Sequence, residues 1–436
     1  MQRKTAGAVL SALFMGLGQM YNRQWMKGIL LLAVGAGCLY GAAVLGLPGY
    51  LKGLWTLGEQ PSGMVKVGKL MKMVEGDHSI FLMIKGLMAA LAAVLALALY
   101  VVGIRDAYKV GKLRDEGRQV NTFRQSLRGV NQRNFAYLVL LLPAVFILFL
   151  TVLPLFFSVL LAFTNYADPI LPPANLIDWV GFANFIKLVS LQVWSDTFFG
   201  VLFWTVIWAA IATATTYIGG IFVAVLIHQP RVRFKAFWRT IMIVPFAIPS
   251  LISLLVMRNM FNNKFGPIND TLRMMGLEGV PWLTNPVWAK ATLLLVNMWI
   301  GIPITMILAF GILTTISRDL YEAADVDGAS SFQKFRRITL PMVLFATAPV
   351  LIMQFAGNIN NFNVIYLLTD GGPVNPNYQY AGHTDLLVTW LYKLALDQAQ
   401  YSFASVIGII IFLIVATLSI WSYRRTRSYK EEDMFV

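Results

Sequence analysis

The sequence contains little of what soluble domains and enzymes are built from. Only 13% of its 436 residues are charged, whereas 58% are hydrophobic. The single cysteine, Cys38, cannot form a disulfide within the chain, so the compartment cannot be inferred from cysteines. The three histidines, His78, His228 and His383, are far apart, and no Cys/His spacing indicates a metal site. This composition does not predict a soluble metalloprotein.

Two signatures of catalysis are also missing. No G-x-x-x-x-G-K-[ST] segment occurs, so the sequence predicts no P-loop and no ATP bound by this chain. No nucleophile and base are spaced as in a catalytic constellation. We therefore expect a chain that is not an enzyme and that binds no metal or cofactor of its own.

What the sequence has instead is long apolar runs. The hydrocarbon core of a bilayer is ~30 Å thick and needs ~20 helical residues to cross, and a helix satisfies its own backbone hydrogen bonds there. Eight runs are long enough, at about 28–48, 80–103, 136–163, 198–227, 240–260, 289–313, 341–367 and 403–423. The sequence predicts an all-α, polytopic membrane protein with eight transmembrane helices.

Basic residues are concentrated in alternate loops. They follow spans two and four and occupy the tail: Arg105, Lys109, Lys112, Arg114, Arg118, Arg124, Arg128, Arg133, Arg231, Arg233, Lys235, Arg239, Arg424, Arg425, Arg427 and Lys430. The intervening loops hold aspartates instead. Because basic loops stay in the cytoplasm, we expect a multi-pass membrane protein with both termini cytoplasmic. The net charge of +14 then reflects topology rather than nucleic-acid binding.

Two regions near the start fit this topology less well. The predicted external loop 49–79 carries Lys52, Lys66, Lys69 and Lys72, against the positive-inside rule. The stretch AGAVLSALFMGLGQMY, within residues 6–21, is too short to span. It predicts an interfacial or re-entrant segment; a signal peptide is the alternative, but no small-residue cleavage site of the expected kind follows.

One compact polar segment, Asp319–Pro341, separates two apolar runs on the predicted cytoplasmic side. Ser317 can cap a helix, and Gly328 is a natural stop. A helix of about eleven residues is expected, followed by a short turn with Phe332 and Phe335 on one face. From these residues alone, a solvated loop helix and a docking helix are equally supported.

Inside the spans the polar residues are amides. Span six carries Asn297, Ile300, Gly301 and Ile304 on one face, and span seven carries Gln354, Gly357 and Asn358. At ~1.5 Å per residue, the asparagines lie roughly 14–18 Å from the outer ends, near the midplane where transporters bind substrate. A charge there would cost ~2.5–3.5 kcal/mol, so its near absence favours a neutral substrate over an ion-driven carrier. Amides suit sugar hydroxyls, although spacing alone slightly favours contacts between helices.

Several motifs carry a resemblance to a known family. Glu322-Ala323-Ala324, Asp327-Gly328-Ala329 and Ile338-Thr339-Leu340-Pro341 resemble the EAA loop of ABC importer permeases. The stretches WVGFANFIKLV, LTDGGP and AGHTDLLVTWLYKLAL are similar to the carbohydrate branch. The resemblance covers most of the chain. It is strongest to the larger permease subunit of maltose and maltodextrin transporters, in the short-loop form of Gram-positive bacteria.

The resemblance implies a type I importer permease with two extra N-terminal helices. It implies that a cytoplasmic helix docks into a separate ATPase through Leu320, Tyr321, Glu322, Ala323, Ala324, Asp327 and Gly328. It places a sugar site at Asn297, Ile300, Gly301, Ile304, Gln354, Gly357 and Asn358. The implied partners are a second related permease, two ATPase subunits that use ATP-Mg, an extracellular sugar-binding protein, the sugar and membrane lipid.

The sequence departs from that family in two ways. The external loop after span three covers only about residues 164–197, where the enteric maltose permeases carry a folded domain. Ile304 and Gly357 stand where the family has aromatic rings against the sugar. A lost ring removes a stacking surface and widens the cavity, so the expected sugar is longer, differently posed, or held mainly by the external binding protein. Trp299, Phe355 and Phe362 are the nearby aromatic replacements.

The expected organisation has four parts. These are an interfacial N-terminal segment 1–27, two helices with a basic loop at 28–134, a six-helix permease core at 135–424 containing the coupling loop 317–341, and a cytoplasmic tail 425–436. The expected function is half of the pore of an ATP-driven maltose or maltodextrin importer. The alternatives are an ABC permease for another oligosaccharide or a sugar alcohol, a secondary carrier, and a non-transporting scaffold.

Overall fold

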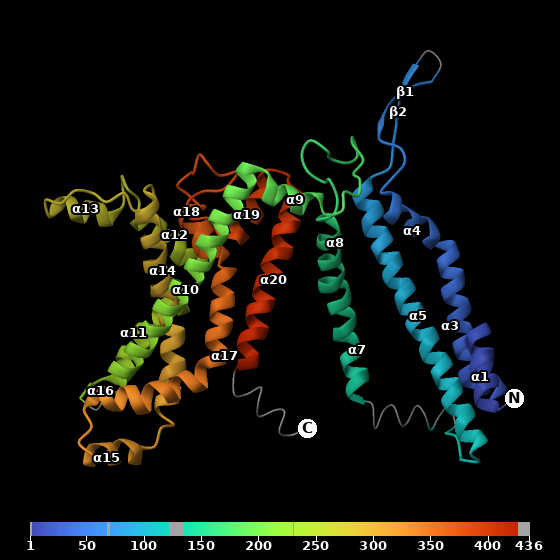
Figure 1. Ribbon diagram of the computed structural model, residues 1–436, viewed down its shortest axis with the longest axis horizontal. Coiled ribbons are helices and arrows are strands. Elements are labelled where there is room, and N and C mark those ends of the chain that lie inside the picture. Colours follow the sequence, from blue (N-terminus) through green and yellow to red (C-terminus); the bar gives the residue numbers. More distant parts are fainter. Residues whose placement is uncertain (1, 68–69, 122–124, 126–134, 230, 426–436) are drawn as a thin grey trace. The chain divides into compact units, whose positions relative to one another are not determined.

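The computed structural model describes residues 2–67, 70–121, 125, 135–229 and 231–425. The chain is predominantly helical and divides into two compact units, Met1–Gly181 and Phe182–Val436 (Figure 1). Residues 122–124 and 126–134 of the basic loop after span two, with Arg124, Arg128 and Arg133, lie outside the described residues, as does the tail 426–436. Each unit is described by itself.

The first unit begins with a short helical layer packed on a long helix. Its elements are α1 (Arg3–Leu13), α2 (Leu17–Tyr21), α3 (Trp25–Val44), α4 (Leu47–Thr56), β1 (Gly63–Val67), β2 (Leu70–Val74), α5 (Ser79–Asp115), α7 (Phe135–Ile147), η1 (Leu148–Val152) and α8 (Leu153–Leu161). The carboxylate of Asp115 on α5 accepts hydrogen bonds from the backbone N–H groups of Arg3 and Lys4, at 3.1 and 3.0 Å. Helix α1 has 11 residues, too few to span, and packs against the last turns of α5.

Buried amides hold the same layer together. The side chain of Gln19 donates to the carbonyl of Gly103 at 2.7 Å, and Asn22 donates to the carbonyl of Ala107 at 2.9 Å. Both amides are almost fully buried. Buried polar groups need such partners, so these bonds fix the depth at which α2 lies along α5.

The hairpin β1–β2 departs from the expectation of an all-α chain. Its strands are antiparallel, with Gly63 opposite Val74 and Val67 opposite Leu70. The segment GMVKVGKLMKMV has β-branched residues and short apolar/polar alternation, both typical of strands. Lys66 and Lys72, which conflict with the positive-inside rule, therefore belong to a folded element that extends from the helices.

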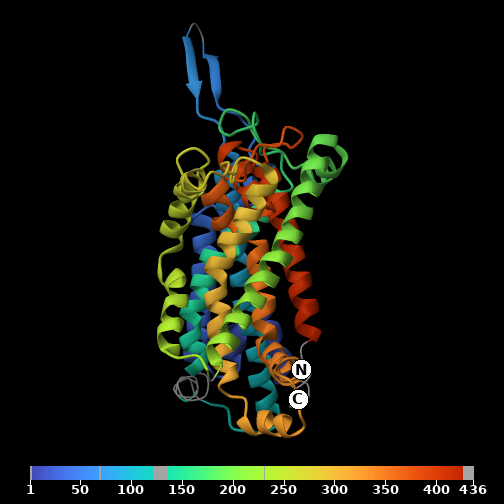
Figure 2. The ribbon, with the colours of Figure 1, turned by 90° about the vertical axis from the view of Figure 1, so that its left-hand side faces the viewer.

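The second unit is a helical bundle around α10. Its elements are α9 (Ala183–Ser190), α10 (Gln192–His228), α11 (Lys235–Ala247), α12 (Ser250–Met260), α13 (Pro267–Met274), α14 (Pro286–Leu313), α15 (Arg318–Val326), α16 (Ser331–Lys334), η2 (Phe335–Thr339), α17 (Leu340–Ile359), α18 (Phe362–Thr369), α19 (Leu387–Tyr392), η3 (Lys393–Asp397) and α20 (Tyr401–Arg425). Helix α15 lies at one end and α19 at the opposite end, and we name these the α15 end and the α19 end (Figures 1 and 2).

Small residues let α10 and α14 approach closely. A Cβ atom added at Gly220 would lie 2.5 Å from the Cβ of Thr305, and one added at Gly301 would lie 2.6 Å from the Cγ2 of Thr216. Two apolar clusters complete the packing. One surrounds Trp208 and Leu293 towards the α19 end, and the other surrounds Ile221 and Met306 towards the α15 end.

The described residues contain seven helices long and apolar enough to cross a membrane, or up to eight if one bent pair is a single span. The bent pair is α11 and α12, which meet at 91° in the predicted fifth span. Pro245 and Pro249 explain the bend, since proline removes a helical hydrogen bond and clashes with the preceding turn. The chain is a multi-pass membrane protein, and the predicted count of eight is reached when this bent pair is counted as one span.

Candidate functional site

A cluster of amide and hydroxyl side chains joins α10, α14 and α17 inside the second unit. The Nδ2 of Asn358 donates to the Oγ1 of Thr213 at 2.9 Å. The Nδ2 of Asn361 donates to the Oδ1 of Asn297 at 3.1 Å and to the Oδ1 of Asn358 at 3.4 Å. We call Thr213, Asn297, Asn358 and Asn361 the amide cluster. Asn297 and Asn358 are each only 7% exposed, so these bonds form in an environment of low polarity.

A helix break creates the geometry of the amide cluster. Helix α17 ends at Ile359 and α18 begins at Phe362, so the predicted seventh span is two helices. Asn361 caps α18, because its Oδ1 accepts from the N–H of Val364 at 3.4 Å, while its Nδ2 reaches Asn297 and Asn358. Interrupted helices deep within the membrane are typical of transporter binding sites.

A second polar contact lies about one helical turn closer to the α15 end. The Nε2 of Gln354 donates to the Oγ1 of Thr216 at 2.8 Å. Thr216 of α10 also faces Gly301 of α14, at the point where α10 and α14 approach closely. Among the described residues, the Nδ2 group of Asn297 has no protein partner, so the amide cluster retains a donor for a ligand hydroxyl.

The seven residues predicted for the sugar site do not share one environment. Asn297, Asn358 and Gln354 join the polar contacts, whereas Gly301 faces α10 and Ile300 packs against the apolar cluster around Trp208. Ile304 is 41% exposed. A Cβ added at Gly357 would meet no atom within 4 Å, so open space lies beside this glycine.

Sequence reasoning missed three members of these contacts, Asn361, Thr213 and Thr216. Asn361 lies in the run NINNF, three residues after Asn358, so helical spacing alone would already have placed the two side chains on one face. The two threonines lie on α10, where the hydroxyl of Thr216 also donates to the carbonyls of Ala212 and Thr213. Nothing in their spacing distinguishes them from ordinary helical threonines.

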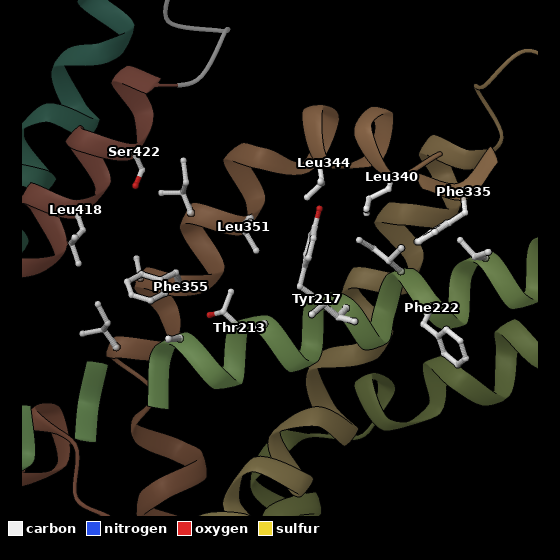
Figure 3. A pocket seen from close by; sticks show the side chains of 18 of the residues that line it. Thr213, Tyr217, Phe222, Phe335, Leu340, Leu344, Leu351, Phe355, Leu418 and Ser422 are labelled. Atoms are coloured by element: carbon white, nitrogen blue, oxygen red, sulfur yellow. The ribbon is translucent and has the colours of Figure 1, made fainter. Parts of the chain in front are cut away.

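A cavity of about 1,140 Å³ lies between α10, α17 and α20 (Figure 3). Its lining is mostly apolar and includes Tyr217, Leu344, Phe355 and Leu418. None of the seven predicted sugar-site residues lines it, but Thr213 of the amide cluster does. Phe355 faces this apolar space.

The polar segment at the α15 end forms the expected helix. Helix α15 covers nine residues, and the Oγ of Ser317 caps it by accepting from the N–H of Asp319 at 3.2 Å. Gly328 has φ +75°, a left-handed conformation that glycine adopts at little cost and that ends the helix. Ser330 and Gln333 then form a capping box that starts α16.

One side chain ties α15 to the bundle while the rest of the helix is open. The hydroxyl of Tyr321 lies 2.8 Å from the Oγ1 of Thr339 in η2. The other predicted coupling residues are exposed, except for Ala324, which is half-buried: they are Leu320, Glu322, Ala323, Asp327 and Gly328. The helix thus presents an uncovered face at the end of the bundle.

At the α19 end, the quoted segments LTDGGP and AGHTDLL fold against each other. Asp385 is almost fully buried; its Oδ2 accepts from the Nζ of Lys393 at 2.9 Å and from the N–H of Gly382 at 2.7 Å. Burial raises the pKa of the Asp385 carboxyl, and the positive charge of Lys393 opposes this rise only in part. Lys393 also donates to the carbonyl of Asp370 at 2.6 Å.

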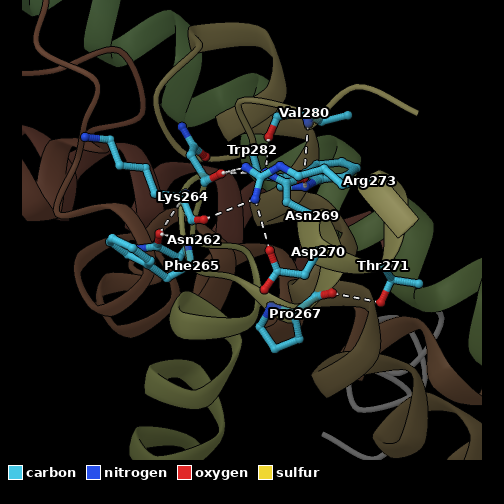
Figure 4. Close-up of polar contacts among 11 residues, drawn as sticks. Asn262, Lys264, Phe265, Pro267, Asn269, Asp270, Thr271, Arg273, Val280 and Trp282 are labelled. Carbon is cyan, nitrogen blue, oxygen red and sulfur yellow. Dashed lines mark hydrogen bonds and ion pairs between the residues drawn. The ribbon is translucent and has the colours of Figure 1, made fainter. Parts of the chain in front are cut away.

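The segment between α12 and α14 is organised by one buried amide (Figure 4). The Nδ2 of Asn269 donates to the carbonyls of Asn263 and Val280, at 3.0 and 2.9 Å. Its Oδ1 accepts from the Val280 N–H at 3.0 Å and from the Trp282 Nε1 at 2.8 Å. Because the side-chain nitrogen and oxygen of Asn269 each make two hydrogen bonds, this amide holds α13 in place at the α19 end.

Comparisons with known proteins agree with the fold and with the motifs. The galactooligosaccharides transport system permease protein GanP of Bacillus subtilis is 41% identical over 98% of both chains. The maltodextrin transport system permease protein MdxF of the same organism is 35% identical over 99% of this chain and 98% of its own. The maltose/maltodextrin permease protein MalF of Escherichia coli is 37% identical over 62% of this chain and 54% of its own.

A solved structure shares the fold. A bacterial ABC transporter involved in the import of the acidic polysaccharide alginate superposes with a TM-score of 0.55, at 22% identity, over 69% of this chain and 98% of that chain. Residues 216–427 also match the family described as "Binding-protein-dependent transport system inner membrane component". The resemblance to ABC importer permeases is confirmed, and the chain belongs to this family of binding-protein-dependent transport components, as a permease subunit and not an enzyme.

Proposed function

We propose that this chain forms half of the translocation pore of an ATP-driven importer for neutral oligosaccharides. The observation that carries the proposal is the amide cluster, which combines uncharged donors and acceptors with a helix break inside a membrane bundle. Maltose and maltodextrins are the first candidate cargo, as the sequence motifs imply. Galactooligosaccharides are the second, because the relative that transports them is 41% identical.

The proposed sugar site keeps the seven residues predicted from the sequence and adds Asn361, while Thr213 would hold Asn358 in place through its hydrogen bond. Asn297, Asn358 and Asn361 would bind hydroxyl groups of the sugar. Gly357 would leave room for the ring, since space beside it is open. Ile300, Gly301 and Ile304 would shape the wall around them. A neutral ligand fits because no charged side chain takes part in the amide cluster.

The proposed topology places the α15 end in the cytoplasm and the α19 end outside the bacterial cell membrane, with both termini cytoplasmic. Residues 135–424 would form the six-helix core of a type I importer permease, after the N-terminal segment 1–27 and the two added helices of 28–134, and 425–436 would be the tail. The basic residues that flank the spans support this orientation.

The proposed coupling device is α15 with its following turn. Leu320, Glu322, Ala323 and Asp327 present an open face that would enter a cleft of a separate ATPase subunit, which uses ATP-Mg. Tyr321 would transmit movement, because it joins α15 to η2 and so to α17. Gly328 would permit the tight turn. A second permease, two ATPase subunits and an external sugar-binding protein complete the importer.

One reconstitution tests this proposal. Liposomes holding the chain, its candidate sister permease, ATPase and binding protein should hydrolyse ATP faster with maltodextrins or galactooligosaccharides, and Glu322→Lys should abolish the increase. Stimulation by only one series would identify the cargo. Uptake that follows an ion gradient without the ATPase would instead support a secondary carrier. A rate of ATP hydrolysis that depends on neither the sugar nor Glu322 would contradict the coupling role.

A further inference from the structure

Three aromatic side chains form a compact group beside the amide cluster. Phe362 and Tyr366 of α18 stack with ring centroids 4.8 Å apart. Tyr392 of α19 lies 4.9 Å from Phe362 and 5.0 Å from Tyr366, measured between ring centroids. We call these residues the aromatic trio. All three are half-buried, so part of each side chain is accessible.

The aromatic trio continues directly from the amide cluster towards the α19 end. Phe362 follows Asn361 in the chain, and Tyr366 lies one helical turn further along α18, ~6 Å on at ~1.5 Å per residue. The opposite face of α18 carries Val364, Ile365 and Leu368, which are buried in the apolar cluster around Trp208. The rings of α18 therefore occupy the face that the core does not cover.

Packing alone does not account for this exposure. Trp390 is two residues from Tyr392 and is fully buried, with its Nε1 bonded to the carbonyl of Gln379. Trp208 on α10 is also fully buried. These two rings are enclosed, whereas the aromatic trio keeps accessible surface next to the amide cluster, where the Nδ2 of Asn297 has no partner among the described residues.

This arrangement suits a sugar chain longer than the amide cluster can cover. A sugar ring has an apolar C–H face that stacks on aromatic rings and an edge of hydroxyls that binds amides. Ile304 and Gly357 supply no aromatic ring beside the amide cluster, while Gly357 leaves open space. The amide cluster therefore offers hydrogen-bonding groups for sugar hydroxyls, and the aromatic trio beside it offers accessible ring faces.

We propose that Phe362, Tyr366 and Tyr392 form a second sugar subsite, which binds the next residue of an oligosaccharide and sets the preferred chain length. This inference rests on the proposed function and adds to it a residue-level determinant of cargo length. A disaccharide would rely mainly on the amide cluster. A longer oligosaccharide would gain the stacking contacts as well.

The test uses the complete importer in liposomes with one wild-type binding protein throughout. Sugar-stimulated ATP hydrolysis is measured with a disaccharide and with a hexasaccharide of the same series, for wild type, Tyr366→Leu, Tyr392→Leu and the ring-retaining Tyr366→Phe and Tyr392→Phe. Phe355→Leu is the matched control, because Phe355 is a half-buried ring of α17 that lines the other cavity.

Each leucine variant should lower stimulation by the hexasaccharide about three- to tenfold, the loss expected for one aromatic contact, and stimulation by the disaccharide less than about twofold. The phenylalanine variants should behave as wild type, and Phe355→Leu should not change the ratio. An equal loss for both sugars, or a length-dependent loss in Phe355→Leu, would overturn the subsite. Wild type that responds to no sugar would overturn the proposed function itself, and the subsite with it.

Discussion

Asn361 donates a hydrogen bond to Asn297 across 64 residues of sequence, at 3.1 Å. This bond links the break between α17 and α18 to the middle of α14. Asn361 also caps α18 and contacts Asn358, so this one side chain links α14, α17 and α18. The site therefore combines residues of α14, α17 and the turn that starts α18.

Asn358→Ala should weaken sugar-stimulated ATP hydrolysis more than assembly of the complex. The change removes one buried bond to Thr213, worth about 0.6 kcal/mol within a membrane, and also removes groups that would bind sugar. Thr213→Val is the matched control, since it removes the same bond and keeps Asn358. Equal effects of both changes on hydrolysis would show that Asn358 serves packing.

The two glycines of the predicted site should respond differently to substitution. Gly301→Val should destabilise the chain by about 1–3 kcal/mol, because even its Cβ would overlap Thr216. Gly357→Val should fold normally, since the space beside it is open. Thermal unfolding in detergent measures both. Gly357→Phe should keep the fold and reduce transport of long sugars, and a fold lost in Gly357→Val would contradict an open site.

Glu322→Lys should abolish coupling while the chain still reaches the membrane. The residue is exposed on α15, so reversing its charge should cost little folding stability but should disturb docking into an ATPase cleft. ATPase co-purification and sugar-stimulated hydrolysis are the measurements. Glu278→Lys, an exposed reversal at the α19 end, is the control and should leave both unchanged. Normal coupling in Glu322→Lys would remove α15 from the coupling role.

Lys393→Met should destabilise the α19 end in a pH-dependent way. Removing one partner of a buried ion pair costs about 3–5 kcal/mol, since Asp385 would remain buried without its counter-charge. Burial raises the pKa of Asp385 in the folded chain, so its contribution to stability is largest below its unfolded pKa and is lost as pH rises through the folded pKa. The penalty should therefore shrink as pH falls.

Unfolding midpoints from about pH 8 to about pH 5 test this linkage. Asp385→Asn should flatten the dependence, and exposed Lys187→Met should leave it as in wild type. A penalty in Lys393→Met that grows on acidification would contradict the assigned sign.

Single cysteines test the topology. In a Cys38→Ser background, Arg118→Cys should react only with reagents that reach the cytoplasm, and Asn175→Cys only with reagents added outside. The basic residues around Arg118 predict this arrangement. The reverse labelling would place the α15 end outside and would exclude its docking to a cytoplasmic ATPase.

Several elements could be predicted from the sequence because their signals are local. The apolar runs predict the long helices, and Ser317 and Gly328 predict the start and end of α15 to within about two residues. The hairpin β1–β2 was missed because its lysines were considered as topology signals, although the same residues alternate as in strands. The bend between α11 and α12 was not predicted. Its prolines, Pro245 and Pro249, are visible in the sequence, but they lie within an apolar run long enough to be one span.

By itself, the sequence determined that this chain crosses the membrane, that α15 is polar and that the spans hold amides in place of charges, because burying a charge costs more than burying an amide. Only the tertiary structure decided which amides meet. It separated Gly301, which packs on Thr216, from Gly357, which faces open space, and it joined Asn361 to Asn297. Helix periodicity defines one face of one helix, whereas a site depends on where helices break and how closely they approach, and those distances are set by packing between segments far apart in the chain.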